Sequence, residues 1–427
     1  MNIIFKSIRV VNPEQNLDGI FDLWIKDGFI HSIATSITNE EPETRVIPGK
    51  DLVALPGFFD MHVHLREPGF EYKEDIQSGC AAAANGGFTG VCCMPNTNPV
   101  IDNVSVVELI RKKAENLPVD VKISAAITQG SQGKQLSPFY ELNEAGVVMF
   151  TDDGKCVTSS EVMKRAFNYA STKKLLIAQH CEDHSLTENF SVNEGVMSSS
   201  LGLKGYPSVA EDIIVKRDIL LNEYTGNNPY HISHISTKNS VKFIREAKSR
   251  GLNVTCEVTP HHFCLNEEFL SSYDTNYKMN PPLRTKEDIQ EILAGLKDGT
   301  IDCIASDHAP HALHEKEVEF EKAPYGIVGL ETTIGLTFTY LYHTNILTLN
   351  DIINKLSTNP RKILNLEPII IKEGNQANLT IVDIDEEWIV DKNQFKSKSK
   401  NTPFNGFKLK GKPKYIINKN QIIESTL

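Results

Sequence analysis

Residues 55–66 of the chain read LPGFFDMHVHLR, an apolar run that ends in two histidines one residue apart. Alternate side chains of a strand point to the same side, so Asp60, His62 and His64 share one face. Two imidazoles at one strand end can hold one metal ion. The segment therefore predicts a strand that carries part of a metal site. The alternative is a pair of exposed histidines on an edge strand.

Seven further apolar runs follow, and helix-like segments alternate with them. Eight strands in alternation with helices favour a parallel (β/α)8 TIM barrel. The runs cover 55–64, 87–95, 119–127, 145–152, 174–180, 229–235, 252–259 and 301–306. The helical segments cover 73–86, 103–116, 136–145, 159–172, 208–223, 237–250, 285–298 and 330–343.

Both ends of the chain have a different pattern, which is typical of short strands. Residues 2–11, 20–26 and 29–36 are rich in β-branched and aromatic side chains, as are 377–383 and pieces of 405–424. We therefore expect one small β domain built from residues 1–54 and 366–427, with the barrel spanning 55–365.

Composition narrows the class of protein. A length of 427 residues suits one large barrel with a smaller satellite domain. The net charge of −11 disfavours binding to nucleic acid or to an anionic membrane. The sequence contains neither an 18-residue apolar stretch nor a recognisable signal peptide, so no membrane span is expected. Eight cysteines without a C-x-x-C pair predict reduced, buried thiols in a cytoplasmic protein.

Histidines and aspartates recur where the predicted strands end. Asp153 follows the fourth run, His180 and His234 end the fifth and lie in the sixth, and Asp307 follows the eighth. A parallel barrel brings such ends to one rim, where active sites form. Asp152 and Asp153 point in opposite directions, so we expect one ligand from the pair, whereas the alternative for either is a turn before Gly154.

Other polar residues of these segments suit different roles. Each of His180 and His234, taken alone, would be an ordinary buried polar residue. They become candidate metal ligands only because they share the rim with His62 and His64. His261 and His262 are expected to support the site rather than to bind metal. Asp307 could accept a proton from a water whose pKa zinc lowers toward about 7, and the alternative is a helix N-cap.

Two residues beside the rim could hold a carboxylate in a fixed plane. Arg66 follows the first strand and offers a guanidinium, while Asn96 follows the second and offers an amide. The alternatives are a surface ion pair for Arg66 and a turn for Asn96. Asn280, in the segment MNPP, is a weaker candidate by itself.

The motifs taken together resemble type I dihydroorotases, which belong to the amidohydrolase superfamily and act in pyrimidine biosynthesis. They run in family order over about residues 1–425, whereas H-x-H alone is shared across the superfamily. The segments that carry the resemblance are PGFFDMHVHLREPG, GGFTGVCCMPNTNPVIDN, FTDDG, QHCED, HISHIST, VTPHH, KMNPPLR, IASDHAPH and EGNQANLTIVD.

The resemblance implies a site with two zinc ions per subunit. His62, His64, Asp153 and Asp307 would bind one ion, and His180 and His234 would bind the second, with Asp153 bridging. Asp307 would be the acid and base. The substrate carboxylate would contact Arg66, Asn96, His311 and His64, and the ring would contact Asn280 and the backbone of Tyr325 and Gly326. The terminal domain would be a β-sandwich.

The resemblance also implies an activity, the reversible hydrolysis of (S)-dihydroorotate to N-carbamoyl-L-aspartate. Residues 308–326 would form a loop that closes over this small-molecule substrate, and a homodimer is possible. Two features vary within the family or superfamily: Asp152-Asp153 stands where many relatives use a carboxylated lysine, and Tyr325 stands where Phe is expected. The alternatives are an allantoinase or hydantoinase, or a non-catalytic scaffold for a carbamoyltransferase. Such scaffolds typically lack metal ligands, and none is missing here.

Overall fold

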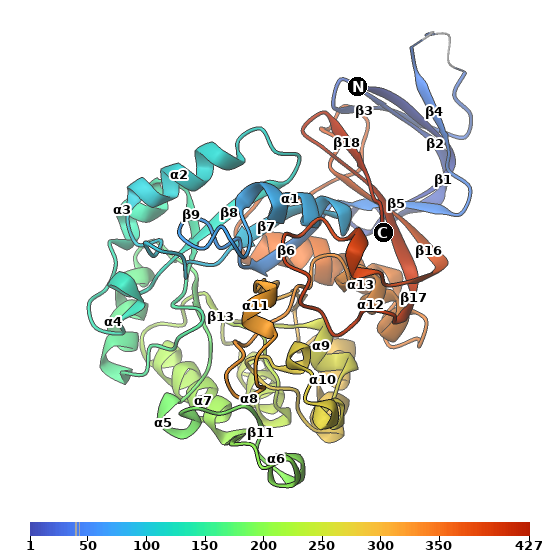
Figure 1. The fold of residues 1–427 in the computed structure, drawn as a ribbon. Coiled ribbons are helices and arrows are strands. Elements are labelled where there is room, and N and C mark those ends of the chain that lie inside the picture. The colour runs from blue at the N-terminus through green and yellow to red at the C-terminus, as the bar shows by residue number, and fades with distance from the viewer. Residues whose placement is uncertain (39–40, 42) are drawn as a thin grey trace.

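The protein is described by a computed structural model that covers residues 1–38, 41 and 43–427. Its two large sheets have eight strands each, and they lie side by side (Figure 1). One sheet curves into a ring surrounded by helices, and the other contains strands from both ends of the chain. The predicted fold class, a TIM barrel with a small β domain formed by both termini, is confirmed.

The ring consists of eight parallel strands in sequence order. Each lies within one of the eight predicted apolar runs, so the number and order of strands were correctly predicted. The strands are β6 (Phe58–Val63), β7 (Phe88–Cys93), β8 (Asp120–Ala125), β9 (Val147–Phe150), β10 (Ile177–Gln179), β13 (Tyr230–Ile232), β14 (Val254–Val258) and β15 (Cys303–Ile304).

The ring closes between its first and last strands through the residues that follow β15. Val63 forms a parallel bridge with His308, and the backbone N–H of His64 donates to the carbonyl of His308 over 2.8 Å. Below them, the N–H of Ser306 donates to the carboxylate of Asp60 over 3.0 Å. Closure therefore brings the H-x-H strand end beside Asp307.

Helices cover the outside of the ring, mostly with an apolar face turned inward. Several begin at a side-chain cap. At the start of α1, for example, the side chain of Asp75 accepts the backbone N–H of Ser78. The main ones are α1 (Ile76–Asn85), α2 (Val104–Ala114), α3 (Phe139–Glu144), α4 (Ser160–Ser171), α7 (Val209–Tyr224), α8 (Lys238–Ser249) and α10 (Lys286–Asp298).

Two predicted boundaries change in the structure. The first predicted run, 55–64, is divided at Gly57, and Leu55 and Pro56 belong to β5 (Leu52–Pro56) of the terminal sheet. A Cβ at Gly57 would lie 1.8 Å from the amide oxygen of Asn378, so the chain turns there between closely packed neighbours. The predicted helix 330–343 is a short α12 (Thr333–Thr337) continued by a π-helical turn, η5 (Phe338–Tyr342).

The terminal sheet joins the two ends of the chain through β5. This strand pairs in parallel with β1 (Asn2–Asn12) and antiparallel with β16 (Leu379–Ile389). The remaining members are β2 (Leu17–Lys26), β3 (Phe29–Ala34), β4 (Arg45–Pro48), β17 (Lys408–Asn418) and β18 (Gln421–Glu424). The exact domain limits and the description as a sandwich stay predictions.

The buried interior agrees with the predicted cysteine chemistry. All eight cysteines are unpaired, seven of them are buried, and burial raises the pKa of their thiols, to about 12 for Cys80. Across residues 1–38, 41 and 43–427, the structure contains no helix whose length and apolar character would allow it to cross a membrane.

Candidate metal centre and substrate pocket

Four histidines and two aspartates meet at the carboxyl ends of the barrel strands. Nε2 of His62 lies 3.3 Å from Oδ1 of Asp153 and 3.5 Å from Oδ1 of Asp307. Nε2 of His234 lies 3.6 Å from the same oxygen of Asp153, and Nδ1 of His180 lies 2.9 Å from Nε2 of His234. Residues up to 245 positions apart in the sequence thus surround one small volume.

Two groups within this cluster have the donor types and spacing of a metal site. His62, Asp153 and His234 form one group, and His62, His64 and Asp307 form the other, with ligand atoms in each group within 4.8 Å of one another. Every predicted metal ligand except His180 belongs to a group, and His180 joins through its contact with His234. Which residue binds which ion stays a prediction.

Among the described residues, two buried polar atoms of the centre lack hydrogen-bond partners, which a metal ion could replace. Nε2 of His62 and Oδ1 of Asp153 are buried, yet within the described part of the chain neither makes a hydrogen bond of good geometry. Buried polar atoms are rarely left without partners, because desolvation is costly. A cation between them would satisfy the nitrogen lone pair and the carboxylate together.

Local charge determines the protonation of the two aspartates. Burial alone would raise their pKa values, but electrostatic attraction to the neighbouring histidines, His62 above all, outweighs it, so both pKa values are lowered. Burial opposes protonation of His62, yet the charges of Asp153 and Glu257 raise its pKa. The centre therefore holds ionised carboxylates ready for a cation.

Three of the four histidines are oriented by a polar side chain on their other ring nitrogen, and two of these partners are buried. Nδ1 of His62 lies 2.6 Å from Glu257, and Nε2 of His180 lies 2.8 Å from Glu182. Nδ1 of His64 lies 2.8 Å from Oδ1 of Asn96. Such partners fix the ring and the tautomer of a ligand. Sequence reasoning missed both acids. Glu257 directly precedes the quoted motif VTPHH, and Glu182 lies inside the quoted motif QHCED.

The side chains of Asp152 and Asp153 point in different directions, as strand geometry predicts. Asp153 faces the histidines, whereas the carboxylate of Asp152 accepts the backbone N–H of Thr128 at 2.9 Å. Gly154 follows with a φ of +77°, and a Cβ there would lie 2.9 Å from the amide nitrogen of Asn96. Glycine thus lets the backbone pass close to a predicted substrate contact.

A cavity of about 270 Å³ lies above the centre and gathers the predicted site residues. All of them line it except His62, which is buried below. The lining residues are His64, Arg66, Asn96, Asp153, Gly154, His180, His234, Asn280, Asp307, Ala309, His311, Pro324, Tyr325 and Gly326. Pockets with a few convergent polar groups are typical of small-molecule sites.

One side of the cavity carries the cationic and amide groups. Arg66 uses Nε to donate to the carbonyl of Pro310 over 3.2 Å, which leaves the outer nitrogens of its guanidinium for a ligand. Burial lowers its pKa to about 10, so it keeps its charge at neutral pH. Behind the lining residues, the ammonium of Lys73 lies 3.3 Å from Nδ1 of His311 and 2.8 Å from the carboxylate of Glu315.

His311 is a neutral group in this environment. Burial and the charges of Arg66 and Lys73 lower its pKa to about 2. Its Nε2 lies 2.8 Å from the carbonyl of Tyr325, so this nitrogen carries the proton and donates there. His311 thus joins the two ends of the loop 308–326 in addition to lining the cavity.

The other side of the cavity holds the residues predicted to contact the ring. The Asn280 amide donates to Glu182 over 2.8 Å, and its Oδ1 has no hydrogen-bond partner among the residues that the structure describes. Tyr325 stacks on Phe190 at 4.5 Å between ring centroids and donates its hydroxyl to the carbonyl of that residue. Phe could not make this last contact, so the hydroxyl of Tyr325 ties the loop to residue 190.

Three site residues adopt a left-handed backbone without being glycine. The φ angles are +62° for Arg66, +28° for His234 and +46° for Asp307. Such angles cost free energy and cluster at functional sites, where surrounding contacts maintain them. The strain lies where the side chains must turn from the strand toward the cavity.

Known proteins resemble this chain over nearly its full length. Residues 51–240 match a family described as dihydro-orotase-like. A dihydroorotase of Syntrophus aciditrophicus is 48% identical over 413 residues, which cover 96% of each chain. This chain belongs to the dihydroorotase family. Another dihydroorotase, from Acetivibrio thermocellus, is 48% identical over 423 residues and 99% of each chain.

Solved structures agree with the fold of this dihydroorotase-family chain. An L-hydantoinase (dihydropyrimidinase) from Arthrobacter aurescens superposes with a TM-score of 0.87 over 99% of this chain and 96% of its own, at 22% identity. A dihydropyrimidinase from Brevibacillus agri gives 0.85 over 100% and 95%, at 20% identity. Identities this low support the shared fold alone.

Proposed function

We propose that the protein is a dihydroorotase, which hydrolyses (S)-dihydroorotate reversibly to N-carbamoyl-L-aspartate in pyrimidine biosynthesis. The observation that carries this proposal is the joint placement of a His and Asp metal centre and of Arg66 around one cavity, in a chain of the dihydroorotase family. The low identity of the hydantoinase neighbours gives no reason to prefer their activity.

The proposed cofactor is a pair of zinc ions in each subunit. His62, His64, Asp153 and Asp307 would hold one ion, and His180, His234 and Asp153 would hold the other. Imidazole and carboxylate donors suit zinc. When bound, the ions would supply Lewis acidity and lower the pKa of water at the site.

The chain's own groups would then position the substrate and move the proton. Arg66 and the amide of Asn96 would hold the substrate carboxylate, with His64 and His311 beside it. Asn280 and the backbone of Tyr325 and Gly326 would contact the ring. Arg66 suits this task because its outer nitrogens can make two parallel hydrogen bonds to a carboxylate.

Asp307 is the proposed acid and base. Its carboxylate is ionised, since its pKa is lowered, and it faces the cavity. It would accept a proton from the attacking water as the carbon–oxygen bond forms. It would return that proton to the ring nitrogen as the carbon–nitrogen bond breaks, so that the nitrogen leaves as a neutral amide.

The proposal is tested by assaying hydrolysis of dihydroorotate before and after treatment with a chelator. We expect turnover that is lost on chelation and restored by zinc, in parallel with metal content. Hydantoin and allantoin provide the comparison substrates. No turnover of dihydroorotate by the zinc-loaded protein would reject the assignment, and faster turnover of hydantoin would favour the alternative.

Two further features belong to the proposal. Eight unpaired cysteines suit a reducing compartment, so we place the enzyme in the cytoplasm. A homodimer is the proposed assembly, which sedimentation of the purified protein would test.

A further inference from the structure

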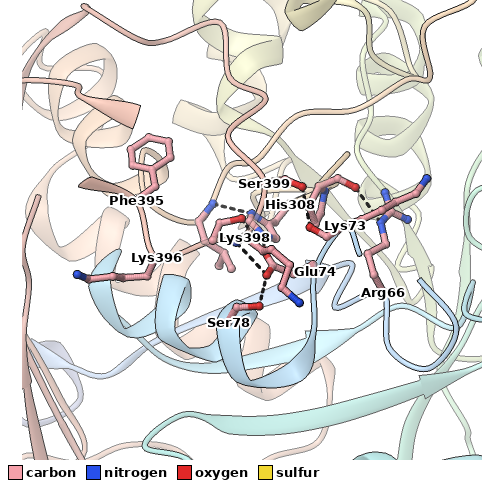
Figure 2. A network of polar contacts seen from close by, with 12 residues as sticks. Arg66, Lys73, Glu74, Ser78, His308, Phe395, Lys396, Lys398 and Ser399 are labelled. Carbon is pink, nitrogen blue, oxygen red and sulfur yellow. Dashed lines mark hydrogen bonds and ion pairs between the residues drawn. The ribbon is translucent and has the colours of Figure 1, made fainter. Parts of the chain in front are cut away.

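The connection between β16 and β17 leaves the terminal sheet and crosses to the barrel rim. Residues 395–401, which we call the strap, pass over the start of α1 and the segment after β15 (Figure 2). The strap comes from the other domain in the predicted division of the chain, yet four of its seven residues are buried. The strap therefore joins the two predicted domains through buried contacts.

Polar contacts fix the first part of the strap to the barrel. Glu74 is fully buried, and it accepts the Ser397 hydroxyl at 2.5 Å and the backbone N–H of Lys398 at 3.1 Å. The same carboxylate lies 3.4 Å from Nε2 of His308, the residue after Asp307 (Figure 2). The hydroxyl of Ser399 donates to the carbonyl of Lys73 over 2.6 Å. The strap is thus held in place before it reaches residue 401.

Asn401, at the end of the strap, contacts both ends of the loop that borders the cavity. Its amide donates to the carbonyls of Ala309 and Gly326 over 3.2 and 3.1 Å. Its side-chain oxygen accepts the backbone N–H of His311 at 3.1 Å. Its own carbonyl accepts the N–H of Val328 at 2.9 Å. One side chain, 6% exposed, therefore uses both of its donors and its acceptor on this loop.

Close packing leaves this loop junction little freedom. Gly326 has a φ of +117°, and a Cβ there would lie 2.6 Å from the Cβ of Ala309. The ring of His311 also donates to the carbonyl of Tyr325. Asn401 does not line the cavity, so it would act through the residues that it holds.

We propose that Asn401 is a positioning residue, which holds the His311 and Gly326 ends of the loop together so that they can contact the substrate. This inference rests on the proposed function. An asparagine suits the task because a single planar amide offers two donors and one acceptor in fixed directions. Truncation would let the loop ends separate without touching the metal centre.

The test compares Asn401→Ala and Asn401→Asp with the zinc-loaded wild type. For Asn401→Ala we expect KM for dihydroorotate to rise about tenfold, the scale of one net hydrogen bond, with kcat within about threefold and bound zinc unchanged. Asn401→Asp keeps the oxygen that faces His311 but places a second oxygen against two carbonyls, so its KM should rise at least as much. Thr402→Val is the matched control, because the Thr402 hydroxyl accepts the N–H of Phe404 and contacts no residue of the loop 308–326 that the structure describes. This variant should leave KM unchanged.

Hydrogen–deuterium exchange supplies a readout that does not need activity. Peptides covering residues 309–328 should exchange faster in Asn401→Ala than in the wild type or in Thr402→Val. Saturating orotate, a dihydroorotate analogue that keeps the ring and the carboxylate, should restore protection. Unchanged exchange, or a KM within about twofold of the wild type, would overturn the inference, and so would loss of zinc in step with activity. A wild type that is inactive on dihydroorotate would instead reject the proposed function, since the exchange rates alone report whether Asn401 holds the loop.

Discussion

The carboxylate of Glu257 lies 2.6 Å from Nδ1 of His62, and both side chains are 1% exposed. Glu257 also faces Nε2 of His231 at 3.3 Å, so its two oxygens serve two histidines inside the barrel. Its pKa is about 2: burial would raise it, but the charge of His62 and the histidine hydrogen bonds lower it. A buried, ionised acceptor thus directs Nε2 of His62 toward the centre.

Glu257→Gln should therefore weaken metal binding. The amide keeps the shape but loses the charge that orients His62 and raises its basicity, so we expect affinity to fall roughly 10- to 100-fold. Competition with a chromophoric chelator would measure it. Glu211→Gln, which changes an equally buried acid that binds the backbone of Ser236, is the control. Equal affinities for the two variants would show that Glu257 does not tune the metal.

Asp307→Asn should separate chemistry from metal content. The amide cannot shuttle the proton, so kcat should fall roughly 100- to 10,000-fold while bound zinc is retained. Steady-state assays combined with metal analysis would test this. The control is Asp302→Asn, which changes an aspartate at the opposite end of β15 and should leave kcat unchanged. Turnover within about threefold of the wild type would exclude Asp307 as the acid and base.

Arg66→Lys should impair recognition of the substrate carboxylate. Lysine keeps the positive charge but lacks the planar fork, and we expect KM to rise roughly 10- to 100-fold. Binding of the analogue orotate, which carries the same carboxylate, should weaken by a similar factor. Arg111→Lys changes an exposed arginine on α2 and should leave both constants unchanged. If Arg66→Lys binds orotate as tightly as the wild type does, the guanidinium does not hold the carboxylate.

Glu331→Gln should change how stability depends on pH. Glu331 is buried beneath the strap, and burial raises its pKa to about 7, against about 4.3 in an unfolded chain. Between these values the folded state binds the extra proton, so the stability that Glu331 contributes is present below about pH 4 and is lost as pH rises through 7. Glutamine has no such dependence.

Urea unfolding of both proteins at pH 5 and pH 8 would test this expectation. From pH 5 to pH 8, the free energy of unfolding of the wild type should fall by up to about 3 kcal/mol relative to that of the variant. Glu14→Gln, at an exposed position, should show no relative change. A difference between wild type and Glu331→Gln that is the same at both pH values would contradict the prediction.

Local patterns in the sequence determined the barrel and the identity of its rim residues. An apolar run marks a buried strand wherever it occurs, and in a parallel barrel every strand ends at the same rim. His62, Asp153, His180 and Asp307 could therefore be gathered without coordinates, because each follows or ends such a run. Side-chain alternation also separated Asp153 from Asp152.

Only the tertiary structure decided which distant groups orient those residues. Glu257 meets His62 across 195 positions, and Asn401 meets His311 across 90. No local period encodes such pairs, since they depend on how the ring closes and on where the strap lies. The first predicted run is likewise divided at Gly57, where the chain packs closely against Asn378. Local sequence patterns therefore determine the helices and strands, whereas tertiary packing determines which distant side chains contact one another.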